Sequence, residues 1–526
     1  MGVVTRLWSD CRRDPEAKIY QFTERVMICN VLQFLERSET ANPDRIALDD
    51  GSEKVTYREY AENARKIGTF LAGKANGRIR EPIAVLIDRN IRSVCAFMGV
   101  VYSGNFYVPI DMTMPESRIR LIFDTLHPML VLDARSAPSP LPFEAEQYDA
   151  VLAETQPDEK LLSAIRRNHI DTDPLYAIFT SGSTGVPKGV LINHRSVIDL
   201  VNAFGDAFSL SGDLVFGNQA PFDFDVSVKD IYNAMALGST IQVLPRKLFK
   251  MPKLLVNYLR EKQISILIWA VSALRILADF KALDGESGLA LQTVMFSGEV
   301  MPTRALNYWM DRLPDIRYVN LYGPTEITCN CTYHIITRRY RDDESIPIGK
   351  AFANTRVFLL DENRNLIQTP HQTGEICIEG TCLAAGYWNN REKTAEAFIL
   401  NPFVSAYESR IYKSGDMGYY NEDGDLFFAS RRDYQIKHMG HRIELGEIEV
   451  ALNAIPFITI ACCVYDEERE RIICHYQAAQ ECKKEIVAEL AGKLPKYMWP
   501  NVYTRHDALP LNKNGKIDRI ALKNQA

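Results

Sequence analysis

The sequence contains no long hydrophobic run. None of its apolar stretches approaches the roughly 18 consecutive residues that a membrane-spanning helix needs. The first residues, MGVVTRLWSDCRRDPEAKIY, carry charges throughout and lack the apolar segment of a signal peptide. We therefore expect a cytoplasmic protein with no membrane partner.

The chain also lacks an excess of basic charge. It has 61 Lys and Arg against 67 Asp and Glu, a net charge of -6, and the two signs are well mixed. Sequence-independent binding of nucleic acid needs a basic patch or stripe, so we expect no nucleic-acid partner. The 11 cysteines form no CxxC pairs at zinc spacing and no disulfide pattern of a small secreted domain. We expect reduced, mostly buried thiols.

Internal repeats, low-complexity tracts and long Pro, Gly or Ser linkers are missing as well. Any movable joint must therefore be a short hinge. What remains is an ordinary globular composition, with 46% hydrophobic and 24% charged residues. A chain of 526 residues predicts two to four structural units, at least one of them large.

Short β-rich runs alternate with helix-length amphipathic stretches in the first two thirds of the chain. Residues 27–50 predict a helix followed by a strand, and the later β-rich runs are 83–87, 129–133, 266–271 and 293–298. This alternation indicates an α/β architecture with largely parallel sheets. After about residue 345 strands separated by Gly, Asn and Asp turns predict an antiparallel or barrel-like unit.

The segment TSGSTGVPKG, residues 180–189, follows the apolar strand LYAIF. Glycines let backbone N–H groups face a ligand, hydroxyls donate to phosphate oxygens, and Lys188 supplies a positive charge, so this composition suits a polyphosphate. It is not the GxxxxGK[ST] loop of P-loop NTPases, because Gly189 follows the lysine. Taken alone, a segment of this composition is more often a flexible surface loop than a phosphate site.

Six further motifs follow the loop in order: FDFDVSVKDIY, NLYGPTE, GEICIEG, YKSGDMG, RRDYQIKHMGHRIELGEIE and PLNKNGKIDR. In this order and spacing they resemble the acyl-adenylate-forming superfamily of acyl-CoA synthetases, luciferases and peptide-synthetase adenylation domains, over about residues 27–523. The strings FDxSV, NLYGPTE and NKNGKIDR resemble the amino-acid-activating branch, which also contains the stand-alone D-alanine–carrier-protein ligases.

The resemblance implies an α/β protein with four parts. A leader of unknown structure at residues 1–25 precedes a large N-terminal adenylating domain at 26–430, which has two α/β sheet subdomains and a β-barrel-like subdomain. A hinge at 431–433, centred on Asp433, joins it to a small, mobile α+β C-terminal domain at 434–526. The charged segment that opens this small domain has the spacing of an amphipathic helix in its second half.

The implied reaction uses ATP and Mg²⁺ to convert an amino acid into aminoacyl-AMP with release of pyrophosphate. The aminoacyl group then passes to the phosphopantetheine thiol of a carrier protein, which is supplied in trans or belongs to a larger synthetase from which this chain is cut. Three alternatives stay open: a D-alanine–carrier-protein ligase, an acyl- or aryl-CoA ligase, and a catalytically silent scaffold that keeps the fold. Intact Lys188, Glu326, Asp416 and Lys516 oppose the scaffold.

The resemblance also implies roles for the nucleotide-binding residues. Thr180, Ser181, Gly182, Ser183, Thr184, Gly185 and Lys188 surround the β- and γ-phosphates, and Ser297, Gly298, Glu299, Asn320, Tyr322 and Gly323 line the adenine slot. Asp416 and Arg431 hold the ribose. Glu326 binds Mg²⁺ and Thr325 lies beside the α-phosphate, although a lone Glu at a helix start is more often a cap.

Lys516 is the implied catalytic lysine, whose ammonium bridges the substrate carboxylate and the α-phosphate. Outside its motif, a lysine this near the end of a chain is usually a solvated surface charge. Because Lys516 lies on the small domain, it acts only when that domain closes. Rotation about the hinge then presents the other face of the small domain, with Lys437 and Gly440, for the thiol-transfer step.

The acyl pocket is expected around Asp225, which pairs with the substrate α-ammonium in the amino-acid-activating branch and opposes a CoA ligase. The bland alternative is that Asp225 caps the helix beginning near Ser227. The other wall residues are Val226, Lys229, Ile268, Met295, Ser297, Leu321, Cys329 and Asn330. Lys229 either meets an acidic side chain of the substrate, reaches solvent, or pairs with Asp230 or Asp223, since a buried ammonium needs a partner.

Overall fold

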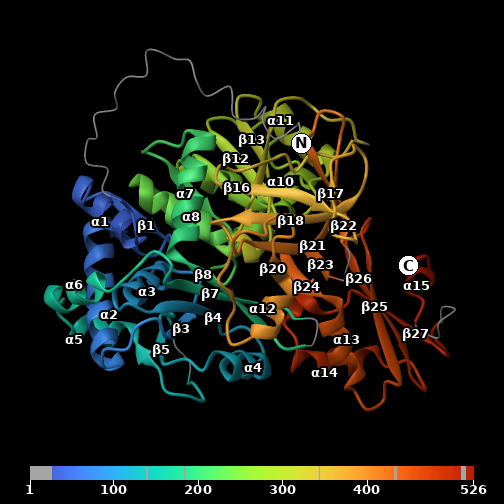
Figure 1. The fold of residues 1–526 in the computed structure, drawn as a ribbon, viewed down its shortest axis with the longest axis horizontal. Helices are drawn as coiled ribbons and strands as arrows, with labels where there is room; N and C mark the ends of the chain where they lie inside the picture. Colours follow the sequence, from blue (N-terminus) through green and yellow to red (C-terminus); the bar gives the residue numbers. More distant parts are fainter. Residues whose placement is uncertain are drawn as a thin grey trace.

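The computed structural model describes residues 27–137, 140–182, 185–342, 344–431, 435–510 and 517–525. The predicted leader 1–25 and the hinge residue Asp433 lie outside this part of the chain. Within it, no helix is long and apolar enough to cross a membrane. The described residues form three large sheets and a small C-terminal α+β unit (Figure 1).

The first sheet has seven strands in the order β19-β8-β7-β4-β3-β5-β6. Its strands are β3 (Pro82–Ile87), β4 (Phe106–Asp111), β5 (Leu130–Asp133), β6 (Glu146–Gln147), β7 (Pro174–Thr180), β8 (Lys188–Asn193) and β19 (Gly386–Tyr387). The helices of this part of the chain are α1 (Leu32–Ala41), α2 (Tyr57–Ala75), α3 (Ile91–Tyr102), α4 (Glu116–Leu126), α5 (Tyr148–Glu154) and α6 (Glu159–Arg167). The predicted phosphate loop is therefore the connection between β7 and its antiparallel neighbour β8.

The second sheet has nine strands in the order β15-β14-β13-β12-β11-β9-β10-β1-β2. They are β1 (Ile46–Asp49), β2 (Lys54–Thr56), β9 (Val215–Asn218), β10 (Thr240–Val243), β11 (Ile266–Ala270), β12 (Thr293–Ser297), β13 (Arg317–Tyr322), β14 (Thr332–Ile336) and β15 (Lys350–Ala351). The accompanying helices are α7 (His194–Phe208), α8 (Val226–Leu237), α9 (Pro252–Glu261), α10 (Val271–Asp279) and α11 (Thr303–Arg312), with short 3₁₀ turns η1 (Arg246–Lys250) and η2 (Thr325–Ile327). Strands β9 to β13 pair in parallel, which is the predicted arrangement.

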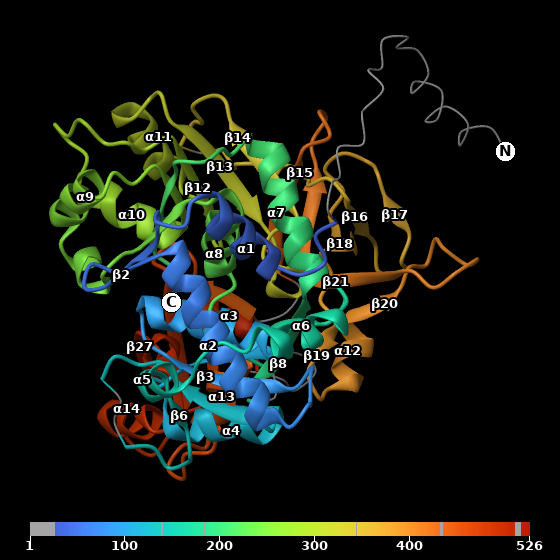
Figure 2. The ribbon, with the colours of Figure 1, turned by 90° about the vertical axis from the view of Figure 1, so that its left-hand side faces the viewer.

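One hydrophobic core joins these two sheets. It takes side chains from β3 and β4 of the first sheet, from β11 and β12 of the second, and from α1, α2, α3, α7 and α8. Figure 2 shows these helices stacked between the two sheets. The phenol groups of Tyr107 on β4 and Tyr232 on α8 are 3.0 Å apart, so a buried hydrogen bond also crosses this layer.

The third sheet is antiparallel and has six strands. They are β16 (Thr355–Leu360), β17 (Leu366–Ile367), β18 (Gly374–Gly380), β20 (Phe398–Leu400), β21 (Arg410–Tyr420) and β22 (Leu426–Arg431), and helix α12 (Arg391–Ala397) precedes β20. The order is β17-β16-β18-β21-β20, with β22 paired to β21. This sheet confirms the barrel-like subdomain that was predicted after residue 345.

The C-terminal unit has a core of its own, built from residues between 436 and 503. It contains a hairpin, β23 (Gln435–His438) and β24 (His441–Glu444), and a three-stranded sheet, β25 (Ile460–Asp466), β26 (Arg471–Gln477) and β27 (Val502–His506). Its helices are α13 (Leu445–Asn453), α14 (Lys483–Ala491) and α15 (Arg519–Lys523), with a 3₁₀ turn η3 (Lys496–Met498). The predicted small α+β unit is confirmed, including the helix in the second half of the charged segment.

Candidate active site

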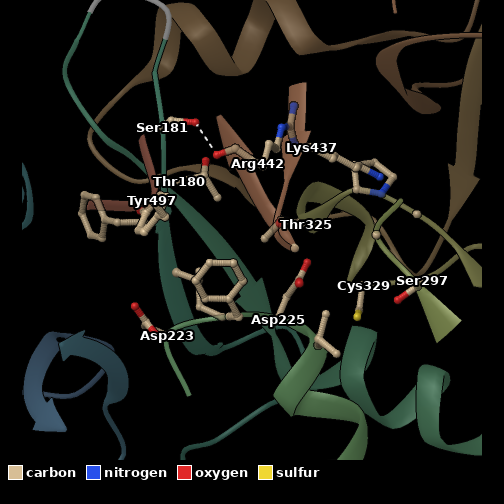
Figure 3. Close-up of a pocket in the computed structure, with 18 of the residues that line it drawn as sticks. Thr180, Ser181, Asp223, Asp225, Ser297, Thr325, Cys329, Lys437, Arg442 and Tyr497 are labelled. Carbon is tan, nitrogen blue, oxygen red and sulfur yellow. Dashed lines mark hydrogen bonds between the residues drawn. The ribbon is translucent and has the colours of Figure 1, made fainter. Parts of the chain in front are cut away.

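A pocket opens where the first two sheets meet the β23–β24 hairpin. Its walls come from the first sheet and α4, the start of α8, the ends of β12 and β13, the β21–β22 pair, and the C-terminal unit. The lining includes Thr180, Ser181, Asp223, Asp225, Ser297, Thr325, Cys329, Lys437, Arg442 and Tyr497 (Figure 3). Residues that were predicted from separate motifs therefore share one cavity.

Glu326 lies at the centre of a buried charge cluster beside this pocket. Its carboxylate accepts a hydrogen bond from the Arg442 guanidinium at 2.6 Å and from the Tyr387 hydroxyl at 2.8 Å, and it pairs with the Lys188 ammonium at 3.3 Å. Burial alone would raise the pKa of Glu326, but Arg442 and Lys188 outweigh it and hold the pKa well below its ordinary value. Glu326 is therefore an ionised carboxylate engaged by cations rather than a helix cap.

The predicted ribose and adenine residues are connected to one another. Asp416 on β21 and Arg431 on β22 occupy opposed positions and form an ion pair, and the Tyr322 hydroxyl donates to the other oxygen of Asp416 at 2.6 Å. The Lys437 ammonium lies 5.7 Å from the centre of the Tyr322 ring. Asn320 is directed elsewhere, because its side-chain amide donates to the Pro347 carbonyl at 2.8 Å.

The segment between β7 and β8 faces the C-terminal unit. The Ser181 hydroxyl donates to the Arg442 carbonyl at 2.8 Å, and Gly182 lies next to the Glu447 carboxylate. The buried hydroxyl of Thr180, which lines the pocket, has no hydrogen-bond partner among the described residues. Ser183 and Thr184 lie outside the described residues, and Gly185 has a φ of +83°, a value that glycine adopts without strain.

Asp225 precedes the first residue of α8, which is the position of a helix cap, yet its side chain makes no capping hydrogen bond. It lies in the pocket instead, next to Thr325 (Figure 3). Burial raises its pKa, and the Thr325 hydroxyl and the charge of Lys229 oppose that rise. The capping alternative thus does not account for this side chain.

The expected wall residues divide into two groups. Val226, Ser297 and Cys329 line the pocket directly. Ile268, Met295 and Leu321 are buried behind them in the central core, where Ile268 and Met295 pair across β11 and β12. The neighbouring Trp269 belongs to a different core cluster and donates its indole N–H to the Gly217 carbonyl.

Lys229 on α8 is fully buried. Its ammonium donates to the Asn330 side-chain oxygen at 2.8 Å and to the Ser297 hydroxyl at 3.3 Å. It forms no salt bridge within 4.0 Å with any described carboxylate. Two expectations for Lys229 are therefore wrong: it does not reach solvent, because α8 packs inside the core, and it does not form an ion pair with Asp230 or Asp223.

The C-terminal unit presents its hairpin to the pocket. Lys437 and Gly440 line the cavity, and the Gly440 N–H donates to the Glu299 carboxylate at 2.7 Å. Two buried or half-buried ion pairs, Arg118 with Glu447 and Arg275 with Glu470, also connect the two units. Lys516 lies outside the described residues, and the Asp518 N–H bonds to the Pro510 carbonyl across that segment at 2.8 Å.

Pocket or charge-cluster residues that were missing from the sequence-based list include Arg118, Tyr387, Arg442 and Tyr497. Each reaches the site through contacts between positions far apart in the chain, as with Arg442 and Glu326, which are 116 residues apart. Only Arg442 had a visible signal, since it lies in the motif that also contains Lys437. The other three have no local pattern that separates them from ordinary core or surface residues.

Comparison with known proteins identifies the family. Residues 35–388 match the family model described as AMP-binding enzyme. The chain is 31% identical over 508 residues to the D-alanine–D-alanyl carrier protein ligase of Lacticaseibacillus casei (strain BL23), covering 94% of this chain and 99% of that protein. It is 32% identical over 499 residues to tyrocidine synthase 1 of Brevibacillus parabrevis, covering 94% of this chain and 45% of that protein.

Solved structures agree with this family. The fold matches that of a Vibrio cholerae adenylation domain in complex with glycyl-adenosine-5′-phosphate with a TM-score of 0.80 at 20% identity, covering 95% of this chain and 98% of the other. At that identity the likeness shows the fold alone. The chain spans less than half the length of the peptide synthetases that it matches. It belongs to the AMP-binding enzymes, the family of AMP-forming adenylating ligases, as an adenylation domain homologous to those of peptide synthetases and to D-alanyl carrier protein ligases.

Proposed function

We propose that this chain activates an amino acid as its aminoacyl-adenylate at the expense of ATP and then transfers it to the phosphopantetheine thiol of a carrier protein. The observation that carries the proposal is Asp225, a carboxylate that makes no helix-capping bond and faces the pocket beside Thr325. A carboxylate in that place gives a substrate α-ammonium its counter-ion. Fatty and aryl acids offer no group for it to bind.

In the first half-reaction an oxygen of the substrate carboxylate attacks the α-phosphorus of ATP, and the bond to pyrophosphate breaks with its electron pair leaving on pyrophosphate. Asp225 holds the ammonium, and Thr325 lies beside it, where its hydroxyl reaches the α-phosphate. Lys188, at the start of β8, neutralises phosphate charge. Lys516 supplies a further cation to the reacting oxygens when the small unit turns toward the large one.

A magnesium ion fits this site through one protein carboxylate. Among the described residues no group of three or more His, Cys, Asp or Glu side chains is arranged to hold a metal, so any ion must take most of its ligands from ATP phosphates and water. Glu326 is the carboxylate that would hold it. The ion would supply charge neutralisation on the phosphates, while Arg442 and Lys188 occupy Glu326 in this arrangement.

In the second half-reaction the thiol sulfur forms a bond to the acyl carbon, AMP leaves with the electrons of the mixed-anhydride bond, and the thiol proton passes to solvent. The described arrangement suits this step, because the hairpin brings Lys437 and Gly440 to the pocket. Arg442 balances the buried charge of Glu326 in this arrangement. Lys437 lines the pocket and interacts electrostatically with Asp416 and Asp225. Its positive charge is placed to stabilise the phosphate of the departing AMP.

A D-alanine–carrier-protein ligase is the second candidate. It is favoured by the length match, since the chain covers 99% of the Lacticaseibacillus casei ligase. An acyl- or aryl-CoA ligase is the third, and Asp225 opposes it. These three candidates differ in the acid that they activate.

Amino-acid-dependent exchange of labelled pyrophosphate into ATP tests the proposal. The substrates are L- and D-amino acids and several aryl and fatty acids. Each is assayed with the wild type and with the Asp225→Ala variant. We expect exchange with an amino acid and its loss in the variant, while ATP binding stays near the wild-type level. Exchange with aryl or fatty acids alone would exclude amino-acid activation, and unchanged amino-acid affinity in the variant would remove the ammonium contact.

A further inference from the structure

Lys229 places a positive charge directly behind the acyl pocket. It follows Asp225 by four residues on α8, and its side chain is fully buried. Its ammonium contacts the Asn330 side-chain oxygen, the Ser297 hydroxyl and the Cys329 thiol. All three are neutral, and two of them, Ser297 and Cys329, form part of the pocket wall.

No nearby carboxylate of the described residues contacts Lys229 directly. Asp230 accepts a hydrogen bond from the Asn218 amide at 2.8 Å and interacts at longer range with the charges of Lys229 and Arg89, without a salt bridge to Lys229 among the described residues. Asp225 feels the charge of Lys229 but is the counter-ion of the substrate α-ammonium in the proposed function. Formation of the adenylate removes the charge of the reacting carboxylate. A bound neutral amino acid would then leave the Lys229 ammonium with no carboxylate in direct contact, and a buried cation without a contacting counter-ion is costly.

The Asn330 side chain adds a second, independent indication. Its oxygen accepts a hydrogen bond from Lys229, but its NH₂ group is buried and has no hydrogen-bond partner among the described residues. Asn330 follows Cys329, which lines the pocket, and buried polar groups are normally satisfied, so an unpaired donor just behind the pocket wall points to an acceptor supplied by a ligand. The ammonium, the amide N–H and the Ser297 hydroxyl together form a cluster of donors.

We propose that the pocket selects an amino acid whose side chain carries a carboxylate, and that Lys229 is the residue that determines this specificity. A carboxylate supplies both the missing negative charge and two acceptor oxygens for Lys229 and Asn330. A methyl side chain, as in alanine, supplies neither. The inference rests on the proposed function, because it assigns the substrate class of the same site.

The test compares acids with their neutral isosteres. Pyrophosphate exchange is measured for the wild type with aspartate, glutamate, asparagine, glutamine, serine and alanine, each as L and D enantiomer. We expect an acidic amino acid to exceed its amide by at least tenfold in kcat/KM. A wild-type preference for alanine, serine or an amide overturns the inference and leaves the proposed function standing, whereas no exchange with any amino acid overturns both.

Variants identify the residue responsible. Lys229→Met keeps the length of the side chain and removes its charge, and it should lower the acid-to-amide ratio at least tenfold with ATP affinity unchanged. Lys229→Arg should keep the preference, and Lys54→Met, at a surface lysine that is 57% exposed, is the matched control. An unchanged ratio in Lys229→Met would overturn the assignment. Because the wild-type ratio is decisive by itself, the test stands even where that variant fails to fold.

Discussion

The carboxylates around the pocket differ sharply in whether a positively charged side chain neutralises them. Glu326 is held ionised by two contacting cations. Asp223, which lines the same pocket on the side of Tyr497, has a buried oxygen with no partner. Burial, reinforced by the charge of Asp111, raises the pKa of Asp223 to about 7. The sequence places these residues in motifs, but it cannot reveal which carboxylate meets a cation, because the cations come from distant segments.

Asp223→Asn should change the pH dependence of stability. From about pH 4 to about pH 7 the folded protein keeps a proton on Asp223 that the unfolded chain, at its ordinary pKa of 3.8, has lost. The free energy of unfolding therefore falls as the pH rises through this range, and the whole loss is present above about pH 7. The variant has no carboxyl group to ionise, so it should be about 1–3 kcal/mol more stable than wild type at pH 8. Thermal unfolding at pH 4, 6 and 8 measures this.

Asp213→Asn is the control, since the Asp213 side chain is 92% exposed. It should follow the wild-type pH profile. Equal profiles for wild type and Asp223→Asn would show that Asp223 is ionised in the folded protein at neutral pH, contrary to the account.

At the scale of elements, the β23–β24 hairpin decides what the pocket can do. It brings Lys437, Gly440 and Arg442 to the cavity and is fixed there by the Ser181, Glu299 and Glu326 contacts. Residues 441–444 form its second strand, and helix α13 begins immediately after at Leu445. The hairpin is therefore part of the same rigid unit as the C-terminal core.

Arg442→Met should weaken this arrangement selectively. Without the guanidinium, the Glu326 carboxylate keeps Lys188 and Tyr387 as its hydrogen-bonding or ion-pair partners. Docking of the hairpin over this buried, ionised carboxylate therefore becomes less favourable. We expect the rate of thioester formation, divided by the rate of pyrophosphate exchange, to fall at least tenfold. Single-turnover loading of a carrier protein gives the first rate. Arg471→Met, on the outer sheet of the same unit, is the control, and a ratio equal to the wild-type value would contradict the assigned role.

Local pattern predicted most of the elements that carry the site. The runs at 83–87 and 293–298 coincide with β3 and β12, because a continuously apolar run of that length between turns fits a strand buried on both faces. Strand β11 ends one residue before the predicted run at 266–271, since Val271 already begins α10. The hairpin was not predicted as such, because its charged residues acquire their partners only through contacts with the large unit.

At the scale of the whole molecule, the two proposed half-reactions would use two placements of the small unit. The described placement brings the hairpin to the pocket, and Lys516 lies outside the described residues, just before Ile517. Ile517, next to Lys516, packs on the outer face of that sheet with Val464 and Leu522. If Lys516 acts as proposed, adenylate formation calls for a rotation that exchanges these two faces.

Lys516→Ala should separate the half-reactions. Pyrophosphate exchange should fall about 10²–10³-fold, the effect of removing one charge-stabilising donor, with ATP affinity near the wild-type value. Thioester formation from chemically supplied aminoacyl-AMP should proceed at the wild-type rate, because the hairpin face is intact. Full exchange activity would show that Lys516 is not the catalytic lysine, and equal losses in both steps would contradict the two-placement account.

The central claim is that this pocket makes an aminoacyl-adenylate, and mass spectrometry of the acid-quenched enzyme tests it most directly. The enzyme is incubated with ATP, magnesium and a mixture of amino acids, with no carrier protein present. We expect a bound species with the mass of an amino acid joined to AMP, together with an equal amount of pyrophosphate. If Lys229 selects a side-chain carboxylate, that amino acid is an acidic one. Recovery of unreacted ATP alone, or of ADP and phosphate, would contradict the central claim.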